Sequence, residues 1–474
     1  MSVAVEQPSD FPAILNRVLW WDTLPVELTQ PLGAPLTADI DADVAIIGAG
    51  FTGLWTAYYL QQQAPGLRIA IVDKYIAGYG ASGRNGGWAS ALFPQDVVAL
   101  AQDAGLPAAM AMTQAMHASV DEIGRVASAH SWDIDYAKGG TVVAARTLAQ
   151  WSAMQQRDAH LRELGIDSGE ELLDAASTRR LMNATAVRGG VFTPNCAAIQ
   201  PAKLVRHLAR HVVERGVELF EHSPALAVEP GVVRTPGGNI RARYVIRATE
   251  GYTAEIPGQR RTLLPFYSLM VATEPLPEET WEQIGLADRP TFSDGRHMVI
   301  YGQRTADGRL AFGGRGAPYS FGSKVAVGTE LDARMHRQLQ ATLIDLFPVL
   351  RGHTFTHGWG GVLGIARDWW ASVGLDPVTG LGWAGGYVGD GVSTSNLAGR
   401  TVAALITRPL AGRTEDPLLA LPWVDHRSRA WEVEPLRWAA TTIGLTATQA
   451  VDAIETRTGK PSVLGRLVGA LTGH

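Results

Sequence analysis

Cysteine is almost missing from this sequence, because Cys196 is the only one in 474 residues. A single cysteine excludes an internal disulfide framework and is typical of proteins in a reducing compartment. Lysine and arginine form no basic block, and the formal net charge is −5. The charge pattern therefore predicts binding to neither nucleic acid nor an anionic membrane.

Long uncharged apolar runs are also missing. No stretch reaches the roughly eighteen residues that a membrane-spanning helix needs. The first part of the chain scatters charged residues among apolar positions, and it lacks a basic start followed by an apolar run. This pattern predicts no signal peptide. We therefore expect a cytoplasmic protein, although the sequence indicates no oligomeric state.

Glycine and proline are plentiful, with 52 and 26 residues, and 46% of the chain is hydrophobic. Such a composition is typical of a globular protein with many tight turns. A chain of this length is too long for one simple core, so two packed domains are expected. The turns favour alternating strands and helices over a helical bundle.

A strand, a turn, a helix and a second strand open the globular part of the chain. Short apolar runs at residues 44–47 and 67–72 predict strands buried on both faces, and residues 52–63 predict a helix between them. The turn fits the G-x-G-x-x-G pattern and reads Gly48, Ala49, Gly50, Phe51, Thr52 and Gly53. In this context the pattern predicts dinucleotide binding, although a glycine turn without a ligand is the alternative.

Each glycine of this turn has a physical role in binding a dinucleotide. Gly48 permits the tight bend, Gly50 lets a pyrophosphate approach the backbone, and Gly53 lets helix and strand pack closely. The helix start supplies free N–H groups to the phosphates. Asp73, with Lys74 beside it, follows the second strand, where a carboxylate should accept hydrogen bonds from ribose hydroxyls.

Later segments predict a second type of layer. Residues 261–314 hold short β-rich runs, at 266–272, 297–301 and 309–312, which indicate a mixed or antiparallel sheet. Helical character is expected at 98–164, 201–215 and 329–347, and strand character at 217–228 and 243–248. A strand at 381–384 leads through another glycine-rich turn into a helix at 392–407. Because a flavin needs contacts at both ends and a nicotinamide enzyme needs only the first turn, FAD is favoured over NAD.

Four ordered segments resemble the FAD-dependent oxidoreductases of the D-amino acid oxidase and glycine oxidase family, and within it the γ-glutamylputrescine oxidase branch. The first segment is Gly80-Ala81-Ser82-Gly83-Arg84-Asn85-Gly86-Gly87, and the second starts with Ala248-Thr249-Glu250-Gly251-Tyr252. The third is Asp307 to Gly314, and the fourth joins Trp359-Gly360-Gly361 to Gly385 through Val392. Together they span about residues 40–410.

The resemblance implies an α/β fold with a Rossmann-like FAD-binding domain and an inserted substrate domain built on a mixed or antiparallel sheet. The expected cofactor domain is discontinuous, at 40–100, 186–258 and 350–412, and the substrate domain covers 101–185 and 259–349. An N-terminal segment, 1–39, and a helical extension, 413–474, flank them. The extension lies beyond the resemblance, and a self-packing helical appendage is favoured over a segment that covers the site, forms a dimer contact or touches a membrane surface.

The same resemblance implies which residues hold FAD besides those of the first turn, Asp73 and Lys74. The polar loop would bind phosphate and flavin edge atoms, and the helix start near Gly389 would face the flavin N1–C2=O region, where the reduced ring is negative. The residues so implied are Gly80, Ala81, Ser82, Arg84, Asn85, Gly86, Gly87, Ala225, Leu226, Ala248, Thr249, Gly251, Tyr252, Gly361, Gly386, Val388, Gly389, Gly391 and Val392.

The implied reaction is oxidation of an amine or amino acid by hydride transfer to flavin N5, followed by hydrolysis of the imine. Oxygen is the expected acceptor and peroxide the product. Sarcosine-oxidising relatives place a lysine over the flavin, whereas the matching segment here, residues 309–312, has none. A flavin dehydrogenase or N-demethylase with another acceptor therefore remains an alternative, as does an electron-transfer subunit.

Substrate contacts are expected from side chains next to the flavin-facing segments. Asp390 could receive a substrate ammonium, or merely complement the helix dipole, and Tyr267 is the other candidate catalytic residue. Arg315 could hold an anionic substrate tail or lie on the surface. The candidate aromatic walls, which core packing would equally explain, are Trp88, Tyr267, Tyr301 and Trp359.

Two further patterns are expected to carry no cofactor. Cys196 lies far in sequence from the flavin-ring motifs, so FAD should be held non-covalently. His207 and His211 share a helix face, but a third ligand is missing and Arg210 lies between them. We therefore expect no metal site.

Overall fold

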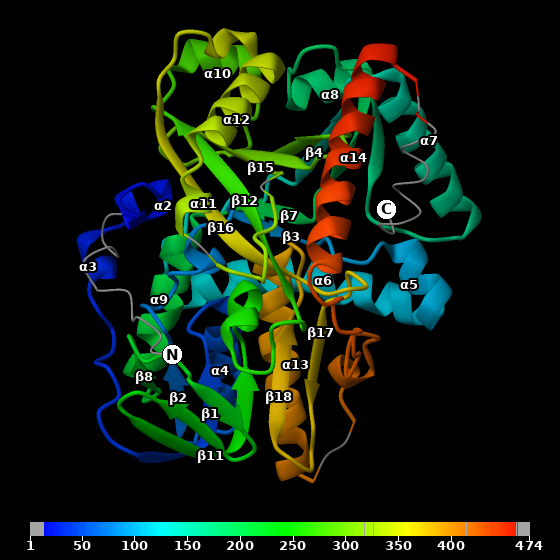
Figure 1. Ribbon diagram of the computed structural model, residues 1–474. Helices are drawn as coiled ribbons and strands as arrows, with labels where there is room; N and C mark the ends of the chain where they lie inside the picture. Colours follow the sequence, from blue (N-terminus) through cyan, green and yellow to red (C-terminus); the bar gives the residue numbers. More distant parts are fainter. Residues whose placement is uncertain (1–13, 317, 326, 413–414, 461, 463–474) are drawn as a thin grey trace.

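The computed structural model describes residues 14–316, 318–325, 327–412, 415–460 and 462, with Val327 described by its backbone alone. Two eight-stranded sheets form its two halves, one low and one high in Figure 1. Among the described residues, no helix combines the length and apolar character that crossing a membrane requires.

The first sheet forms as expected around the opening βαβ unit. Its strand order is β17-β18-β11-β1-β2-β8, and every pair along it is parallel except the edge pair β17–β18. A small antiparallel extension, β9 and β10, continues from β11. The bounds are β1 Ile40–Ile47, β2 Ile69–Val72, β8 Glu218–Phe220, β9 Ala227–Glu229, β10 Val232–Thr235, β11 Gly238–Arg247, β17 Ser372–Leu375 and β18 Leu381–Gly385.

Helices that cover this sheet bring together distant parts of the sequence. Helix α4 (Phe51–Gln63) packs against α13 (Gly391–Leu410) and α9 (Pro201–Glu214). A Cβ at Gly399 would lie 2.6 Å from the Trp55 Cβ, so glycine permits the close approach of α13 to α4. Helices α5 (Val97–Ala104) and α6 (Leu106–Ala129) extend this layer, and their apolar faces join the same core.

The second sheet has the order β16-β12-β15-β14-β13-β4-β6-β5, and only β13 and β4 run parallel. Helices α7 (Leu148–Glu163), α8 (Ala175–Leu181), α10 (Glu278–Ile284) and α12 (Ala333–Leu346) belong to this half. The strands are β4 Thr141–Ala145, β5 Glu171–Asp174, β6 Gly189–Thr193, β12 Leu264–Thr273, β13 Thr291–Asp294, β14 Ile300–Arg304, β15 Leu310–Arg315 and β16 Phe355–Ile365.

The expectation of continuous helical character over 98–164 is wrong at β4. The Thr141–Ala145 segment pairs with β13 and β6, because its β-branched residues Val142 and Val143 suit a sheet whose partners come from distant parts of the chain. Strands β6 and β16 also pair within the second sheet, although their residues fall in ranges expected for the cofactor domain. Strand β16 also borders a cavity at the ends of the first sheet's strands, so both halves contribute to its wall.

The remaining short elements lie outside the two large sheets. They comprise the two-stranded sheet of β3 (Trp88–Ser90) with β7 (Cys196–Ala198), the N-terminal helices α2 (Leu19–Asp22) and α3 (Val26–Thr29), and α11 (Val327–Glu330). The 3₁₀ turns are η2 (Ala81–Gly83), η3 (Glu250–Glu255), η4 (Pro348–Leu350) and η5 (Pro417–Ala420).

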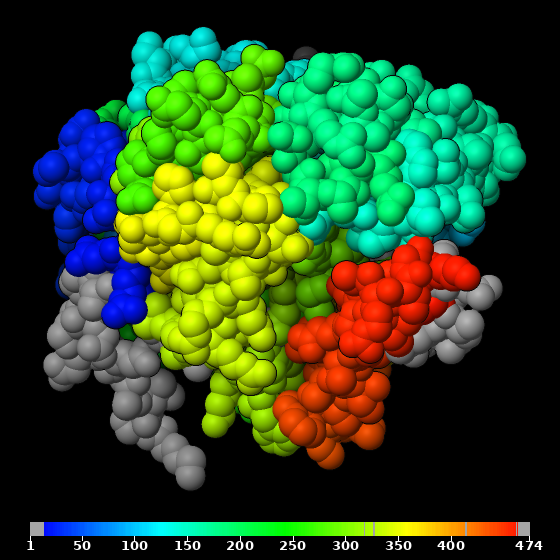
Figure 2. All heavy atoms as spheres, turned by 90° about the horizontal axis from the view of Figure 1, so that it is seen from above, coloured from blue at the N-terminus to red at the C-terminus, as the bar shows by residue number. Residues whose placement is uncertain are grey.

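The described part of the C-terminal extension contains the long helix α14 (Leu436–Thr458), drawn in red on the surface in Figure 2. It docks on the second half, where Asp452 accepts hydrogen bonds from the backbone N–H groups of His297 and Met298 at 2.8 and 2.7 Å. The expected helical extension thus has a helix, while 413–414, 461 and 463–474 lie outside the described residues.

Candidate active site

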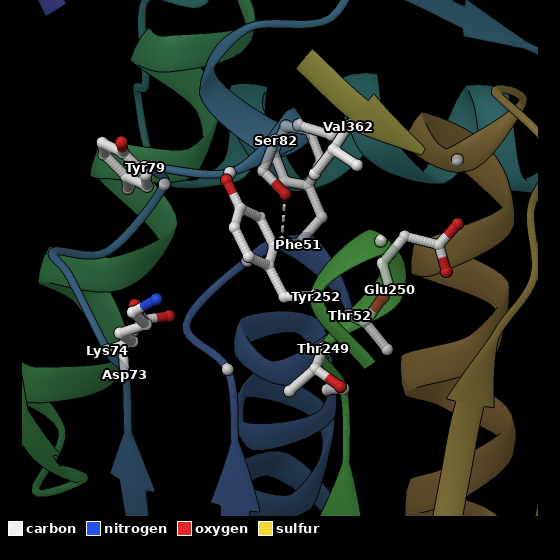
Figure 3. A pocket seen from close by; sticks show the side chains of 18 of the residues that line it. Phe51, Thr52, Asp73, Lys74, Tyr79, Ser82, Thr249, Glu250, Tyr252 and Val362 are labelled. Atoms are coloured by element: carbon white, nitrogen blue, oxygen red, sulfur yellow. Dashed lines mark hydrogen bonds between the residues drawn. The ribbon is translucent and has the colours of Figure 1, made fainter. Parts of the chain in front are cut away.

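An elongated cavity opens where the parallel strands of the first sheet end. It encloses about 1210 Å³ of space, part of it open to solvent. Figure 3 shows Asp73 and Lys74 at the end of β2, and Thr249 and Glu250 at the end of β11, on either side of the start of α4. The carboxyl ends of parallel strands are where such sheets bind ligands.

The first glycine turn has the geometry that dinucleotide binding requires. Gly48 has a φ of +105°, which a residue with a side chain rarely adopts. A Cβ at Gly53 would lie 2.0 Å from the Gly48 carbonyl oxygen, so only glycine lets α4 begin this close to the turn. The Ser82 hydroxyl accepts a hydrogen bond from the Phe51 N–H at 2.8 Å, while no side chain caps the following N–H groups.

Asp73 braces the turn and also faces the cavity. One carboxylate oxygen accepts the Ala49 N–H at 2.7 Å and the other accepts the Tyr75 N–H at 2.8 Å. Burial raises the pKa of Asp73 to about 6, against the opposing effect of these N–H donors. Lys74 and Glu255 form an ion pair at 3.2 Å at this end of the cavity.

At the far end, a second helix begins at the cavity. Gly389 has a φ of +109°, and α13 follows at Gly391 without a side-chain cap from Asp390. The Tyr387 hydroxyl lies 2.9 Å from the Thr52 hydroxyl, so it connects the segment before α13 to the first turn of α4. This end is otherwise walled by Val362 and Leu363 of β16 and by Val392 and Ser395 of α13.

Glu250 holds the second glycine turn in place. Its carboxylate accepts hydrogen bonds from three backbone N–H groups, those of Gly364 (3.2 Å), Gly386 (2.8 Å) and Tyr387 (3.2 Å). Burial raises the pKa of Glu250 to about 7. The side chain therefore ties the end of β11 to β16 and to the segment that leads into α13.

Most of the predicted cofactor residues line this one cavity. They are Gly48, Gly50, Phe51, Thr52, Asp73, Lys74, Gly80, Ala81, Ser82, Asn85, Ala225, Ala248, Thr249, Gly251, Tyr252, Gly389, Gly391 and Val392. The predicted residues that are not part of its lining are Ala49, Gly53, Arg84, Gly86, Gly87, Leu226, Gly361, Gly386 and Val388. Several of the latter support the wall: Ala49 and Gly386 donate to Asp73 and Glu250.

Arg84 lies behind the wall in a buried cluster. Its guanidinium forms an ion pair with Glu330, and both side chains are almost fully enclosed. It also stacks on the Tyr79 ring, with 4.1 Å between the guanidinium carbon and the ring centroid. Desolvation by burial lowers the pKa of Arg84, but the Glu330 carboxylate together with Tyr252 and Tyr79 outweighs this effect and raises the pKa above the ordinary arginine value.

None of the predicted substrate residues belongs to the lining of the described cavity. Tyr267 and Trp359 are fully buried in the second half, and the Trp359 indole N–H donates to the Arg84 carbonyl at 2.8 Å. The Tyr301 hydroxyl bonds the Ser268 hydroxyl at 2.7 Å, and the Trp88 indole donates to the Gly302 carbonyl at 3.2 Å. In this structure Tyr267 and Trp359 pack as core residues.

Arg315 and Asp390 do lie next to the far end of the cavity. The Arg315 guanidinium donates to the Val388 carbonyl at 2.5 Å, and a Cβ at Gly389 would lie 2.9 Å from the same guanidinium. Burial raises the pKa of Asp390 to about 6, while the positive charge of Arg315 opposes this rise. The two opposite charges thus flank the start of α13.

Several cavity residues were missed by the sequence patterns. Tyr75, Tyr79, Tyr387 and Glu250 have no motif of their own, and Val362 and Leu363 resemble any other residues of a β-strand. The usable signal in the sequence was position within the segments that carry the family resemblance. Glu250 lies inside segment 248–252, and Tyr387 lies inside segment 385–392.

The cavity suits FAD by its donors and its shape. Uncapped N–H groups at the start of α4 would hold the pyrophosphate, and the Asp73 carboxylate would hold the adenosine ribose. A Cβ at Gly50 would lie 2.9 Å from the Ser82 hydroxyl, so a side chain here would fill the cradle. The second uncapped helix start, that of α13, lies at the far end of the cavity, where the flavin ring of a bound FAD would reach.

Cys196 and the histidine pair are not part of the lining of this cavity. Cys196 is buried in β7, and its thiol lies 3.4 Å from the Thr291 hydroxyl. His207 stacks on Trp132, and His211 packs against His130 and Tyr58. Across the residues that the structure describes, no three His, Cys, Asp or Glu side chains gather in a metal-binding group.

Comparison with known proteins gives one family match, which covers most of the chain. Residues 43–405 match the family described as FAD dependent oxidoreductase. The chain is 27% identical to gamma-glutamylputrescine oxidoreductase of Escherichia coli over 377 residues, which is 78% of this chain and 85% of that protein. It is 22% identical to sarcosine oxidase subunit beta of Arthrobacter sp over 366 residues, which is 73% of this chain and 84% of that protein.

Solved structures share the fold at lower identity. Glycine oxidase from Geobacillus kaustophilus superposes with a TM-score of 0.65 at 21% identity, covering 81% of this chain and 99% of that one. L-proline dehydrogenase from P. horikoshii gives a TM-score of 0.64 at 18% identity, with 81% and 96% covered. These likenesses agree with the Rossmann-like domain and inserted sheet expected from the sequence.

Proposed function

Since this chain belongs to the FAD-dependent oxidoreductase family, we propose that it oxidises a small amine or amino acid. The observation that carries the proposal is the single cavity into which α4 and α13 both begin, with the Asp73 carboxylate at one end and Arg315 and Asp390 beside the other. The relatives named for γ-glutamylputrescine, sarcosine and glycine support an amine as the reducing substrate.

When bound, FAD would supply the two-electron oxidising chemistry, hydride acceptance from the carbon next to the amine nitrogen, and the imine product would then be hydrolysed by water to a carbonyl compound. The protein's own residues bind and orient. Val362, Leu363 and Val392 of the lining exclude water from the far end. Asp390, which lies beside that end, receives an ammonium group of the substrate. Arg315 holds an anionic tail, and Trp88 and Tyr301 lie on the second-sheet side of the polar loop.

The test begins with the purified protein. We expect a visible flavin band that bleaches without oxygen when a suitable amine is added, and release of free FAD on acid precipitation. The panel should include γ-glutamylputrescine, N-methyl amino acids and aminophosphonates. A colourless protein that gains no band when FAD is added would refute the proposal.

Oxygen is the electron acceptor that we propose, with peroxide as the product. The resemblance to the γ-glutamylputrescine branch supports it, although the segment 309–312, which matches the strand where sarcosine-oxidising relatives place a lysine, contains none. Stopped-flow mixing of the reduced protein with air distinguishes the two acceptors. Reoxidation within seconds is expected, whereas reduced flavin that persists for minutes would indicate a dehydrogenase. We further propose a cytoplasmic location, supported by the single cysteine.

A further inference from the structure

A second cavity lies beside the Glu250 turn, on the side away from the cofactor cavity. It encloses about 1370 Å³, partly open to solvent, and it is lined by β11, β17, β18, the segment after η3 and residues 426–428. Ile256 borders both cavities. Residues 426–428 follow the end of the family match at 405, so one wall is supplied by this chain's extension.

Arg247, the last residue of β11, brings a poorly compensated positive charge to this cavity. Its guanidinium donates one hydrogen bond, to the Thr253 hydroxyl at 3.1 Å, and no carboxylate of the described residues lies within ion-pair distance. Burial lowers the pKa of Arg247 to about 10, so the group is still protonated at neutral pH. Arg247 is half-buried and belongs to the lining of this cavity.

Arg427 brings a second cation. Its guanidinium lies over the Trp383 ring, 4.4 Å from the centroid, and it also lacks an ion pair among the described residues. His426, beside it, is paired with Asp368 at 2.8 Å and stacks on Trp370, with 4.6 Å between ring centroids. These stacked rings give the cavity a firm aromatic wall.

The lining contains one carboxylate to balance the two arginines. Asp376 is that residue, and its oxygens already accept hydrogen bonds from the Val378 N–H and the Thr379 hydroxyl. The negative charge of Glu250 also acts on Arg247. The Glu250 carboxylate, however, already accepts hydrogen bonds from three backbone N–H groups. The positive charges of the lining therefore belong to the two arginines, and the buried indole N–H of Trp370 is a further donor without a partner among the described residues.

We propose that this second cavity binds a small oxyanion, a carboxylate or a phosphate, through Arg247 and Arg427. Planar guanidinium groups match two oxygens of such an anion at once. The proposal does not rest on amine oxidation, since neither arginine lines the cofactor cavity. It assigns to residues 426–428 a part in ligand binding.

Calorimetric titration of the FAD-loaded protein with inorganic phosphate and with succinate, at constant ionic strength, tests the proposal. We expect saturable binding of at least one of the two, with one site per chain, and the titrant that binds identifies which oxyanion is preferred. Arg247→Gln and Arg427→Gln should each weaken binding by about tenfold or more. Arg243→Gln is the matched control, because Arg243 lies exposed on the same strand with its guanidinium over Tyr244, and it should bind as the natural protein does.

Visible absorbance and circular dichroism establish that each variant is folded and loaded. If Arg247→Gln does not fold, Arg427→Gln carries the test, because its segment lies outside both sheets. The proposal is overturned if neither titrant gives saturable heat, or if the folded arginine variants bind as tightly as the Arg243→Gln control.

Discussion

At the scale of single residues, the site depends on carboxylates that accept several backbone N–H groups at once. Asp73 accepts two and Glu250 accepts three, so each fixes the shape of a turn as well as facing the cofactor cavity. Hydrogen bonds to a charged group contribute more than neutral ones, about 1.5–3 kcal/mol each. Single substitutions at these positions should therefore have measurable effects.

Asp73→Asn should weaken FAD binding by about 10- to 100-fold, because an amide NH₂ would face one of the N–H donors that the carboxylate now accepts. Fluorescence titration of the apoprotein with FAD measures the change. Asp43→Asn is the control, since Asp43 lies in the same sheet but bonds Arg68 on the surface. Equal affinity of both variants would contradict the role given to Asp73.

Asp390→Asn should remove a pH dependence of substrate binding. The pKa of Asp390 is raised to about 6, so below that pH the carboxyl is neutral and attracts an ammonium less strongly. In the natural protein KM should therefore rise as the pH falls through about 6. The variant should show a higher KM at pH 8 and no inflection near pH 6. An unchanged inflection would assign the titration to another group.

At the scale of elements, two helix starts meet across the cofactor cavity. Glycines let each helix begin close to its strand, and the hydroxyls of Thr52 and Tyr387 connect them. Local rules were sufficient for the first start, because strand, turn and helix follow one another in the chain. They were insufficient for β4, whose short β-branched run is stabilised by strands about 50 and 150 residues away.

Gly53→Ala should displace the first turn and impair both folding and FAD binding. The new Cβ would meet the Gly48 carbonyl, a backbone atom that cannot move without opening the turn, at an expected cost of about 1–3 kcal/mol. Thermal melting and FAD retention measure the effect. Gly66→Ala is the matched control: Gly66 has open space around its Cβ position, and the variant should melt as the natural protein does. A Gly53→Ala protein that keeps its flavin and its melting temperature would show that the turn is looser than described.

At the scale of the whole molecule, the C-terminal extension clamps the second half of the protein. Glu434 accepts hydrogen bonds from the Tyr319 hydroxyl at 2.6 Å and from the Gly322 N–H at 2.9 Å, and it pairs with Arg437. The Trp431 indole donates to the Ile365 carbonyl at the end of β16, the strand that walls the cofactor cavity. The extension thereby stabilises the loop after β15 and the shared wall.

Glu434→Ala should lower the melting temperature clearly, since the loss leaves several donors without their acceptor at a cost of about 2 kcal/mol or more. Glu432→Ala is the control, because Glu432 forms an exposed ion pair with Arg367 that should contribute about 1 kcal/mol or less. Differential scanning calorimetry compares the two. Equal melting temperatures would mean that the extension is only loosely attached.

The sequence by itself determined the dinucleotide turn and the acid at the end of β2, because each depends on residues close together in the chain. It also determined the family, through four short segments spread over about residues 40–410. The tertiary structure decided what faces the far end of the cavity. Trp359 and Tyr267 pack into the core, whereas Tyr387, Val362 and Glu250 line the cavity. A side chain's partners there come from strands and turns more than a hundred residues apart, and no local pattern encodes which of two faces a strand turns toward the cofactor.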